Sequence, residues 1–585
     1  MNKIINRLFY NLSLTIFGIL TLTFLMTSVG FIFRIPVNIF DLFIPFGLGV
    51  FYLFKKSDTK KEFLIQLILL FVIIAISYGI SLTFWDDTWD GRAYHSAAII
   101  MLKNGWLPLF DNIAEITQKL SLYPYNTQFS DIYLKFSEII GANIYNLTGH
   151  IESPKTSNLL FLCSVFMYSF SLLNKITNKT ASSIILSVCI CLNLPCVYQL
   201  LTNYVDIQIY FAFTFLIFTV LKIEKSSTLT KTDTFMLVMS SLMLSAVKLS
   251  GLAYTFIIYF CWGIFRILRK KEVKSIVISA FSALVLILIT CINPFYTNFK
   301  NHSHPFYPVM GKDKFDVLEF QYPSGFKNKS RLERFIISTF SESTNSIENH
   351  AWTSLNQPAY WKIPFTRIKD APLSKFEYPD MRIGGFGYYW SGILCLTFLL
   401  FFFLRFNSKE DKYLYIFLLF TVTLTVAINP HCWWARFVPQ FWLIVIFTLA
   451  SVFSDNIKFP KFAKSIAYIC IFFIFYNATE PLKNHFYIKF CYTNYYKNLY
   501  NSIKNETYSN SVYFMQNRNY NSNLADETIK IHLKENKTNL IETDFDKDEI
   551  LKNEYISLQQ FNKVYEEYYF YKPVSAKDDK LRENN

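Results

Sequence analysis

The chain alternates long apolar runs with short polar loops that are rich in lysine and arginine. An α-helix of about twenty apolar residues crosses the hydrocarbon core of a bilayer, which is about 30 Å thick. The pattern therefore predicts an all-α polytopic membrane protein with about thirteen transmembrane helices. The segments expected to span are 9–33, 39–54, 63–83, 159–173, 182–200, 207–221, 235–247, 252–267, 275–292, 389–404, 413–428, 437–453 and 466–476.

The basic residues give these helices a direction. The short loop after the second run contains four lysines, Lys55, Lys56, Lys60 and Lys61. Among the later runs, every second connecting loop is again rich in lysine or arginine. Because short cytoplasmic loops carry an excess of positive charge, we expect these loops and the N-terminus inside the cell. The long segments 85–158 and 293–388 are then extracytoplasmic loops.

The composition changes after the last apolar run. Residues 1–478 form the predicted transmembrane domain, whereas the chain from about Thr479 is polar and rich in Asn, Lys and Tyr. We expect residues 479–585 to form a small extracytoplasmic α/β domain or a tail. The abundance of Asn, Lys, Ile and Phe is typical of an AT-rich bacterial genome, so the expected location is the bacterial inner (plasma) membrane.

Charge and cysteine content exclude several other classes. Only 17% of the residues are charged, below the average of about 25%. The net charge of +14 is explained by the cytoplasmic loops, so no nucleic-acid partner is expected. Most of the ten cysteines lie within apolar runs and none forms a CxxC pair, which argues against a zinc site or a disulfide framework.

Three carboxylates follow directly on the run 63–83. Asp86, Asp87 and Asp90 lie among tryptophans in the sequence FWDDTWD. Carboxylates at the membrane surface usually serve chemistry, ion binding or a salt bridge. Two alternatives stay open: Asp90 caps the helix that follows it, or the three aspartates together hold a metal ion.

A short amphipathic helix is predicted after these aspartates. Apolar residues recur at intervals of three and four from Asp90, which brings Tyr94 and His95 close to it, and Gly105 is a candidate stop. A second amphipathic helix is expected over 129–140, lying along the membrane interface.

Other residues at the extracytoplasmic ends of spans are candidates for binding. Asp206 precedes the run 207–221, Lys248 interrupts two short runs, and Arg436 follows two tryptophans. Arginine fits phosphate through its planar fork, and aromatic rings serve as platforms for sugars. The simpler alternatives are that Lys248 reaches to the interface and that the tryptophans anchor the protein in the membrane.

Several of these segments resemble the GT-C superfamily of integral-membrane glycosyltransferases. The motif Asp90-x-x-x-Tyr94, followed by a helix and Gly105-Trp-Leu-Pro108, resembles the first outer loop of protein O-mannosyltransferases and lipid A aminoarabinose transferases. The segment His304-Pro-Phe-Tyr307-Pro is similar to a Gly-Asn-Pro-Phe-Tyr-Pro stretch of bacterial members. Trp433-Trp-Ala-Arg436 resembles their Trp-Ala-Arg-Tyr-x-Pro stretch.

The resemblance covers roughly residues 64–452, and it departs from the family at two places. Gly91 stands where family members commonly carry Glu, and two predicted spans precede the first outer loop instead of one. The break at Lys248–Gly251 resembles the helical break that follows a short span in the family.

The resemblance implies inverting transfer of a sugar from a polyprenyl-phosphate donor to a glycan, lipid or protein acceptor, without a cofactor. Asp90, with Asp87 second, would be the general base, and Arg436 and Lys248 would hold the phosphate. Asp206, Tyr94, His95, His304 and Tyr307 are further candidates for substrate binding. No metal is required by this scheme.

Two other functional classes fit the same pattern of spans. An O-antigen-type polymerase or ligase also has many spans and a large outer loop, but relies on loop arginines more than on an early aspartate cluster. A secondary transporter would favour charges at mid-membrane and repeated halves. This chain has no internal repeat, and its acidic residues lie at the ends of spans.

Overall fold

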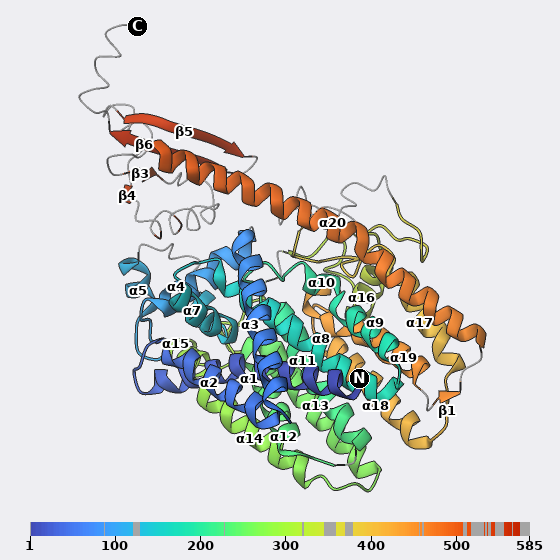
Figure 1. The fold of residues 1–585 in the computed structure, drawn as a ribbon. Helices are drawn as coiled ribbons and strands as arrows, with labels where there is room; N and C mark the ends of the chain where they lie inside the picture. The colour runs from blue at the N-terminus through green and yellow to red at the C-terminus, as the bar shows by residue number, and fades with distance from the viewer. Residues whose placement is uncertain are drawn as a thin grey trace.

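The structure is a computed structural model, and it is built mainly of helices (Figure 1). It describes residues 2–86, 88–120, 129–226, 228–316, 318, 321–343, 359–368, 378–454, 457–458, 461–506, 512–515, 532, 535, 540–543, 555–563 and 566–573. The candidate base Asp87 and most of 479–585 after Glu506 lie outside these residues.

The described α-helices include one or more on each predicted apolar run and several shorter ones in the predicted loops. In chain order they are α1 (Asn2–Ile32), α2 (Phe40–Lys56), α3 (Lys60–Thr83), α4 (Ser96–Lys103), α5 (Ile113–Lys119), α7 (Phe136–Thr148), α8 (Thr156–Thr177), α9 (Thr180–Cys191), α10 (Leu194–Val197), α11 (Asp206–Ser226), α12 (Lys231–Val247), α13 (Leu249–Leu268), α14 (Lys274–Thr290), α15 (Ile292–His302), α16 (Arg331–Thr339), α17 (Trp390–Phe403), α18 (Lys409–Ile428), α19 (Leu443–Phe453) and α20 (Lys461–Glu506).

Seven of the described helices are long and apolar enough to cross a membrane, or eight if α14 and α15, which meet at a bend of 58°, form one span. Three more apolar helices, including α9 and α17, are shorter. The chain is thus an all-α membrane protein in its main body, and each of the predicted segments falls on a helix. The number thirteen stays a prediction, because several of these helices are too short to span alone.

The bundle has a buried centre and an apolar rim. Almost every side chain of α11 is buried, and α11 packs against α8, α12 and α13. By contrast, α3 exposes large apolar side chains such as Phe71, Val72 and Ile76. An apolar face of this kind is stable in lipid, because the hydrocarbon keeps its apolar side chains out of water.

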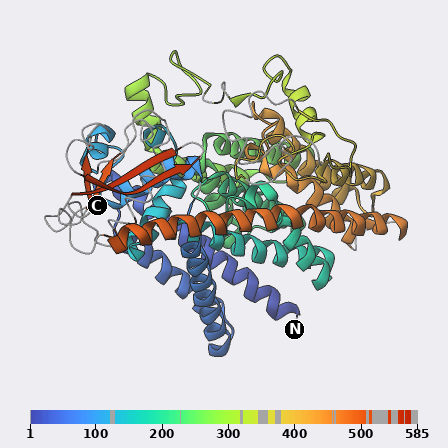
Figure 2. The same ribbon diagram turned by 90° about the horizontal axis from the view of Figure 1, so that it is seen from above.

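A small sheet follows α20 in the chain. Its strands β3 (Val512–Met515), β4 (Leu540–Thr543), β5 (Tyr555–Lys563) and β6 (Glu566–Pro573) have the order β4-β3-β6-β5, and only the β3–β4 pair is parallel. A second pair, β1 (Arg405–Phe406) and β2 (Ile457–Lys458), is antiparallel. Figures 1 and 2 show α20 as one long helix that ends beside β5 and β6. It continues through position 479, so the expected domain boundary there is not marked by a break in the helix.

Two local predictions can be compared directly with the structure. The helix expected over 129–140 is broken, because residues 129–132 are helical, 133–135 are not, and α7 begins at Phe136. The predicted environment is wrong, because Phe136 and Ile140 are fully buried. The apolar face of this segment packs on protein instead of lying along the membrane. The break at Lys248 is confirmed: this single residue is extended and separates α12 from α13.

The expected sidedness of the loops can be tested by cysteine labelling. We replace the exposed Cys395 and Cys491 by serine, and introduce Ser324→Cys in the loop before α16 or Thr228→Cys between α11 and α12. Both positions are exposed. The positive-inside rule predicts that a membrane-impermeant thiol reagent labels Ser324→Cys in intact spheroplasts and Thr228→Cys only after lysis. The reverse order of labelling would contradict the assigned topology.

Candidate functional site

Four of the predicted site residues meet in one cluster. Asp90 lies in the loop after α3, Asp206 is the first residue of α11, Lys248 separates α12 from α13, and Arg436 lies in the 3-10 helix η6 (Ala435–Phe437) between α18 and α19. All four stand at helix ends or in connections, although Asp90 and Arg436 are 346 positions apart in the chain.

The four side chains form an alternating line of charges. Arg436 Nη1 lies 2.9 Å from Asp90 Oδ2 and 3.7 Å from Asp206 Oδ2, and Lys248 Nζ lies 2.7 Å from Asp206 Oδ1. The side chains of Arg436 and Asp206 are buried, whereas that of Lys248 is 36% exposed. The cluster therefore has a buried end and an end that is open to solvent.

The carboxylate of Asp90 faces the cluster and does not cap a helix. Its residue precedes the π-helix η1 (Gly91–His95), has helical backbone angles, and makes no side-chain capping hydrogen bond. The capping alternative is therefore wrong. Among the described residues, Asp90 makes its polar contact with Arg436 through Oδ2, and its Oδ1 has no hydrogen-bond partner.

The position of Lys248 depends on a close approach of two helices. A Cβ on Gly251 would lie 1.8 Å from the carbonyl oxygen of Leu244, so only glycine permits α13 to start so close to the end of α12. Lys248 Nζ then lies 4.2 Å from the ring centroid of Phe437 and pairs with Asp206. It is held by a carboxylate and an aromatic face, and does not simply reach toward the interface.

A fifth member of the cluster, Asp380, was missed in the sequence. Asp380 Oδ1 lies 2.9 Å from Arg436 Nε and accepts a hydrogen bond of 2.8 Å from Trp434 Nε1. Its Oδ2 accepts from Nε and Nη2 of Arg382, at 3.0 and 2.9 Å. The only signal was a pair of opposite charges two positions apart in a loop, which is too common to single out.

The cluster is electrically balanced within an aromatic wall. Three cations, Arg436, Arg382 and Lys248, face three carboxylates. The rings of Tyr204, Phe437 and Trp434 lie 4.9, 4.8 and 5.3 Å from the guanidinium carbon of Arg436. Burial alone would lower the pKa of Arg436, but Asp380 and Asp90 raise it well above its ordinary value. Arg436 is thus a permanent cation.

Tyr94 lies beside this cluster, in contact with several other aromatic rings. Its ring centroid is 5.8 Å from those of Phe129 and Tyr133 and 6.3 Å from that of Trp89. Burial, with a further contribution from Asp90, raises the pKa of Tyr94 well above its ordinary value. The phenol stays protonated and can donate a hydrogen bond.

The three other predicted binding residues have different surroundings. His95 is buried and its Nδ1 lies 2.5 Å from Glu138 Oε1, so this pair belongs to the core. His304 Nδ1 accepts from the backbone N–H of Phe306, and the ring of Tyr307 stacks on His302 at 3.6 Å. These contacts are local, and within the described residues none of the three side chains pairs with Arg436.

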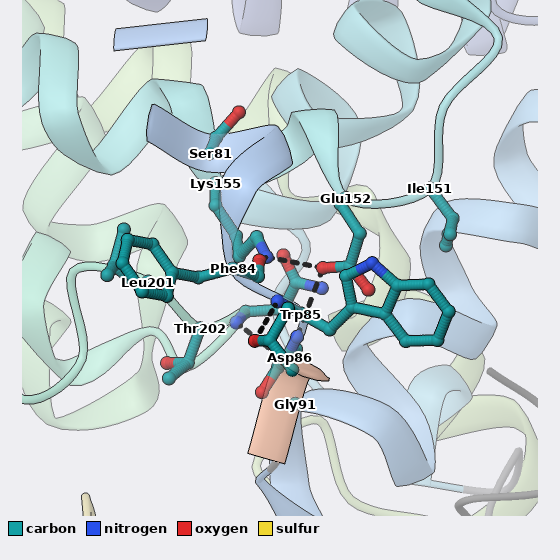
Figure 3. A network of polar contacts seen from close by, with 12 residues as sticks. Ser81, Phe84, Trp85, Asp86, Gly91, Ile151, Glu152, Lys155, Leu201 and Thr202 are labelled. Carbon is teal, nitrogen blue, oxygen red and sulfur yellow. Dashed lines mark hydrogen bonds and ion pairs between the residues drawn. The ribbon is translucent and has the colours of Figure 1, made fainter. Parts of the chain in front are cut away.

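Asp86 turns away from the cluster into a second polar network (Figure 3). Its Oδ1 accepts from the backbone N–H and the hydroxyl of Thr88, and its Oδ2 accepts from the backbone N–H of Asn203 at 2.7 Å. Burial raises the pKa of Asp86. Asp86 and Asp90 therefore have different partners, and Asp87, the third aspartate of the metal alternative, lies outside the described residues.

The same network fixes the loop to the start of α8. Glu152 Oε2 accepts from the backbone N–H of Asp86 at 3.1 Å and pairs with Lys155, which also donates to the carbonyl oxygen of Phe84. Burial alone would raise the pKa of Glu152, but the charges and hydrogen bonds of Lys155 and His532 together lower it to about 2. Glu152 is thus a buried anion that orders the loop before Asp90.

The conformation of this loop predicts a strict requirement for glycine at position 91. A Cβ there would lie 2.2 Å from Asp86 Oδ2 and 2.3 Å from Thr88 Oγ1. We expect Gly91→Ala to lower the free energy of unfolding by about 1–3 kcal/mol, the usual cost of overpacking. The measurement is the thermal unfolding midpoint in detergent. The control is Gly263→Ala in α13, which has open space around it; equal midpoints for the two variants would contradict the packing argument.

The arrangement offers a carboxylate oxygen with no partner in the described residues, a buried arginine and a partly exposed lysine within one line of contacts. Such a set can accept a proton and hold an anion side by side. Comparisons with protein-family models, with curated proteins and with solved structures find no match for this chain.

Proposed function

We propose that the chain is an integral-membrane glycosyltransferase. It moves a sugar from a polyprenyl-phosphate donor to a glycan, lipid or protein acceptor of the cell envelope, on the extracytoplasmic face. The observation that supports this proposal best is the contact of 2.9 Å between Asp90 and Arg436, which puts a candidate base beside a candidate phosphate ligand.

In this proposal Asp90 is the general base. The acceptor hydroxyl attacks the anomeric carbon of the sugar and loses its proton to Oδ1 of Asp90. Asp206 and Asp380 are less suited to this step, because both oxygens of each are within contact distance of cations or hydrogen-bond donors. Asp86 is likewise used by the loop itself. Of these four carboxylates, Asp90 is the one with an oxygen that has no hydrogen-bond partner in the described residues, and this oxygen would receive the proton of the acceptor.

Arg436 and Lys248 hold the leaving group in the same scheme. The bond between the anomeric carbon and the phosphate oxygen breaks, and the electron pair stays on that oxygen. Arg436 uses Nη1 and Nε for its aspartates, and its Nη2 makes no ion pair in the part of the chain that the structure describes. This nitrogen and the exposed part of Lys248 would carry the developing charge of the phosphate.

The location of the charges favours transfer over transport. Asp90, Asp206, Lys248 and Arg436 lie at helix ends, where a lipid-linked substrate has access from the membrane surface. A transport pathway would need charged groups near the middle of spans.

Substitution of Asp90 by asparagine tests the base. Asn has the same shape and can still accept a hydrogen bond from Arg436, but it cannot take a proton at neutral pH. We expect Asp90→Asn to reduce transfer about a hundredfold or more, the usual contribution of a general base. The measurement is mass spectrometry of cell-envelope glycans in a strain lacking the gene and complemented with each variant, at equal protein levels in the membrane.

The matched control is Asp58→Asn, which changes an exposed carboxylate paired with Arg7 far from the site. It should retain full activity. An active Asp90→Asn together with an inactive Asp87→Asn would move the base to Asp87. Full activity of both would refute the carboxylate mechanism for this loop.

Substitution of Arg436 by lysine tests the phosphate contact. Lysine keeps the charge but loses the planar fork that contacts Asp90, Asp380 and a phosphate together. Loss of one charged hydrogen bond of about 1.5–3 kcal/mol predicts a decrease of about tenfold to a hundredfold in transfer. The same change at the partly exposed Arg269, which pairs with the exposed Glu410, should have no effect. Wild-type activity of Arg436→Ala would remove Arg436 from the site.

A further inference from the structure

The second half of α20 buries polar side chains and exposes aromatic ones. Its buried face carries His485, Lys489 and Thr493 beside Tyr496, and Lys489 is only 1% exposed. Its outer face carries an aromatic patch, defined here as Phe486, Tyr487, Phe490 and Tyr495, in which Tyr487 is 68% exposed. A helix lying on a protein in water would bury the aromatic side chains and expose the lysine.

The buried face is polar because it satisfies backbone groups of two loops. Thr493 Oγ1 accepts from the backbone N–H of Trp85, and Lys489 Nζ donates to the carbonyl oxygen of Leu201 at 3.5 Å. Both loops lead directly into the candidate site, toward Asp90 and Asp206. This half of α20 therefore braces the site from outside.

The aromatic patch lies at the level where an apolar helix ends. The ring of Phe486 is 6.3 Å from that of Phe84, and Lys497 Nζ donates to the carbonyl oxygen of Thr83 at 3.0 Å. Thr83 is the last residue of α3, which exposes apolar side chains along its length. The end of such a helix marks the boundary between hydrocarbon and headgroups.

The patch also continues the exposed face of the first half of α20. Tyr468, Phe472 and Tyr476 are exposed there, and the polar residues Thr479 and Lys483 separate them from the patch. Figure 2 shows that the helix is continuous between the two halves. Exposed aromatic side chains followed by a lysine are typical of a segment that passes from hydrocarbon into the headgroup region.

We infer that the aromatic patch binds phospholipid in the headgroup region at the α3 C-terminal end of the bundle. The occupant is the membrane in which the spans lie, because the patch follows the exposed apolar residues of the first half of α20 along the same helix and is adjacent to the end of α3. The inference is independent of the reaction at Asp90. It implies that the loops at Trp85 and Leu201 are held at a fixed depth, close to the membrane surface.

The native Cys491, which is exposed in the same helical segment, allows a direct test. The Cys395→Ser variant is labelled with a nitroxide and reconstituted into vesicles of phosphatidylethanolamine and phosphatidylglycerol. Electron paramagnetic resonance then compares collision rates with oxygen, which concentrates in lipid, and with a water-soluble nickel chelate. A lipid reference carries the label at Cys395 in a Cys491→Ser chain, and a water reference carries it at Ser324→Cys in a chain lacking both exposed cysteines.

Contact with phospholipid predicts that the oxygen-to-nickel ratio at Cys491 shifts away from the Ser324→Cys value toward that at Cys395. A ratio equal to that at Ser324→Cys would overturn the inference, because the patch would then face water. Shielding from both reagents with dipolar coupling between labels on different molecules would also overturn it, because a second copy of the chain would then cover the patch.

Discussion

The structure around the candidate site depends on charge compensation inside an apolar helix bundle. Arg436 is buried, and a buried cation that loses its partner costs about 3–5 kcal/mol. Asp90, Asp206 and Asp380 supply the opposing charge, and Lys248 and Arg382 balance the carboxylates in turn. These residues come from chain segments that are distant in sequence, so the ion pairs determine how the loops after α3, before α11 and before α17 are placed against each other.

The positions of the helices could be predicted because lipid and protein interior both demand apolar side chains. The same property explains the errors. An apolar stripe does not reveal whether lipid or protein covers it, and the segment at Phe136 proved to be core. The composition of a segment also does not show which of its residues lie on the buried face of a helix and which on the exposed face. The polar residues of α20 after 479 suggested a new domain, whereas Lys489 and Thr493 are buried against loops and the helix continues.

The order of the spans predicts which residues lie on the same face of the membrane, and to that extent the candidate site could be predicted from the sequence. That argument grouped the segment 86–90, Asp206, the segment 302–308 and Arg436, with Lys248 as a further phosphate ligand. The structure brings Asp90, Asp206, Lys248 and Arg436 into contact, whereas Asp86, His304 and Tyr307 have other partners. It could not find Asp380, whose contacts with Arg436 and Trp434 arise only when its loop folds back on η6. His95 was placed near Asp90 by helical spacing alone, and its buried partner Glu138 comes from a separate helix.

Asp86 and Asp90 lie at the two ends of one short loop, and their carboxylates have different partners. Asp86 accepts hydrogen bonds from Thr88 and Asn203 through both oxygens, so it orders the loop and has little capacity for a substrate. Gly91 makes this turn possible because it leaves space for the Asp86 carboxylate. Asp90, four residues later, faces Arg436 through a single oxygen. The environment and not the residue type thus decides which of these two aspartates keeps an oxygen without a partner in the described residues.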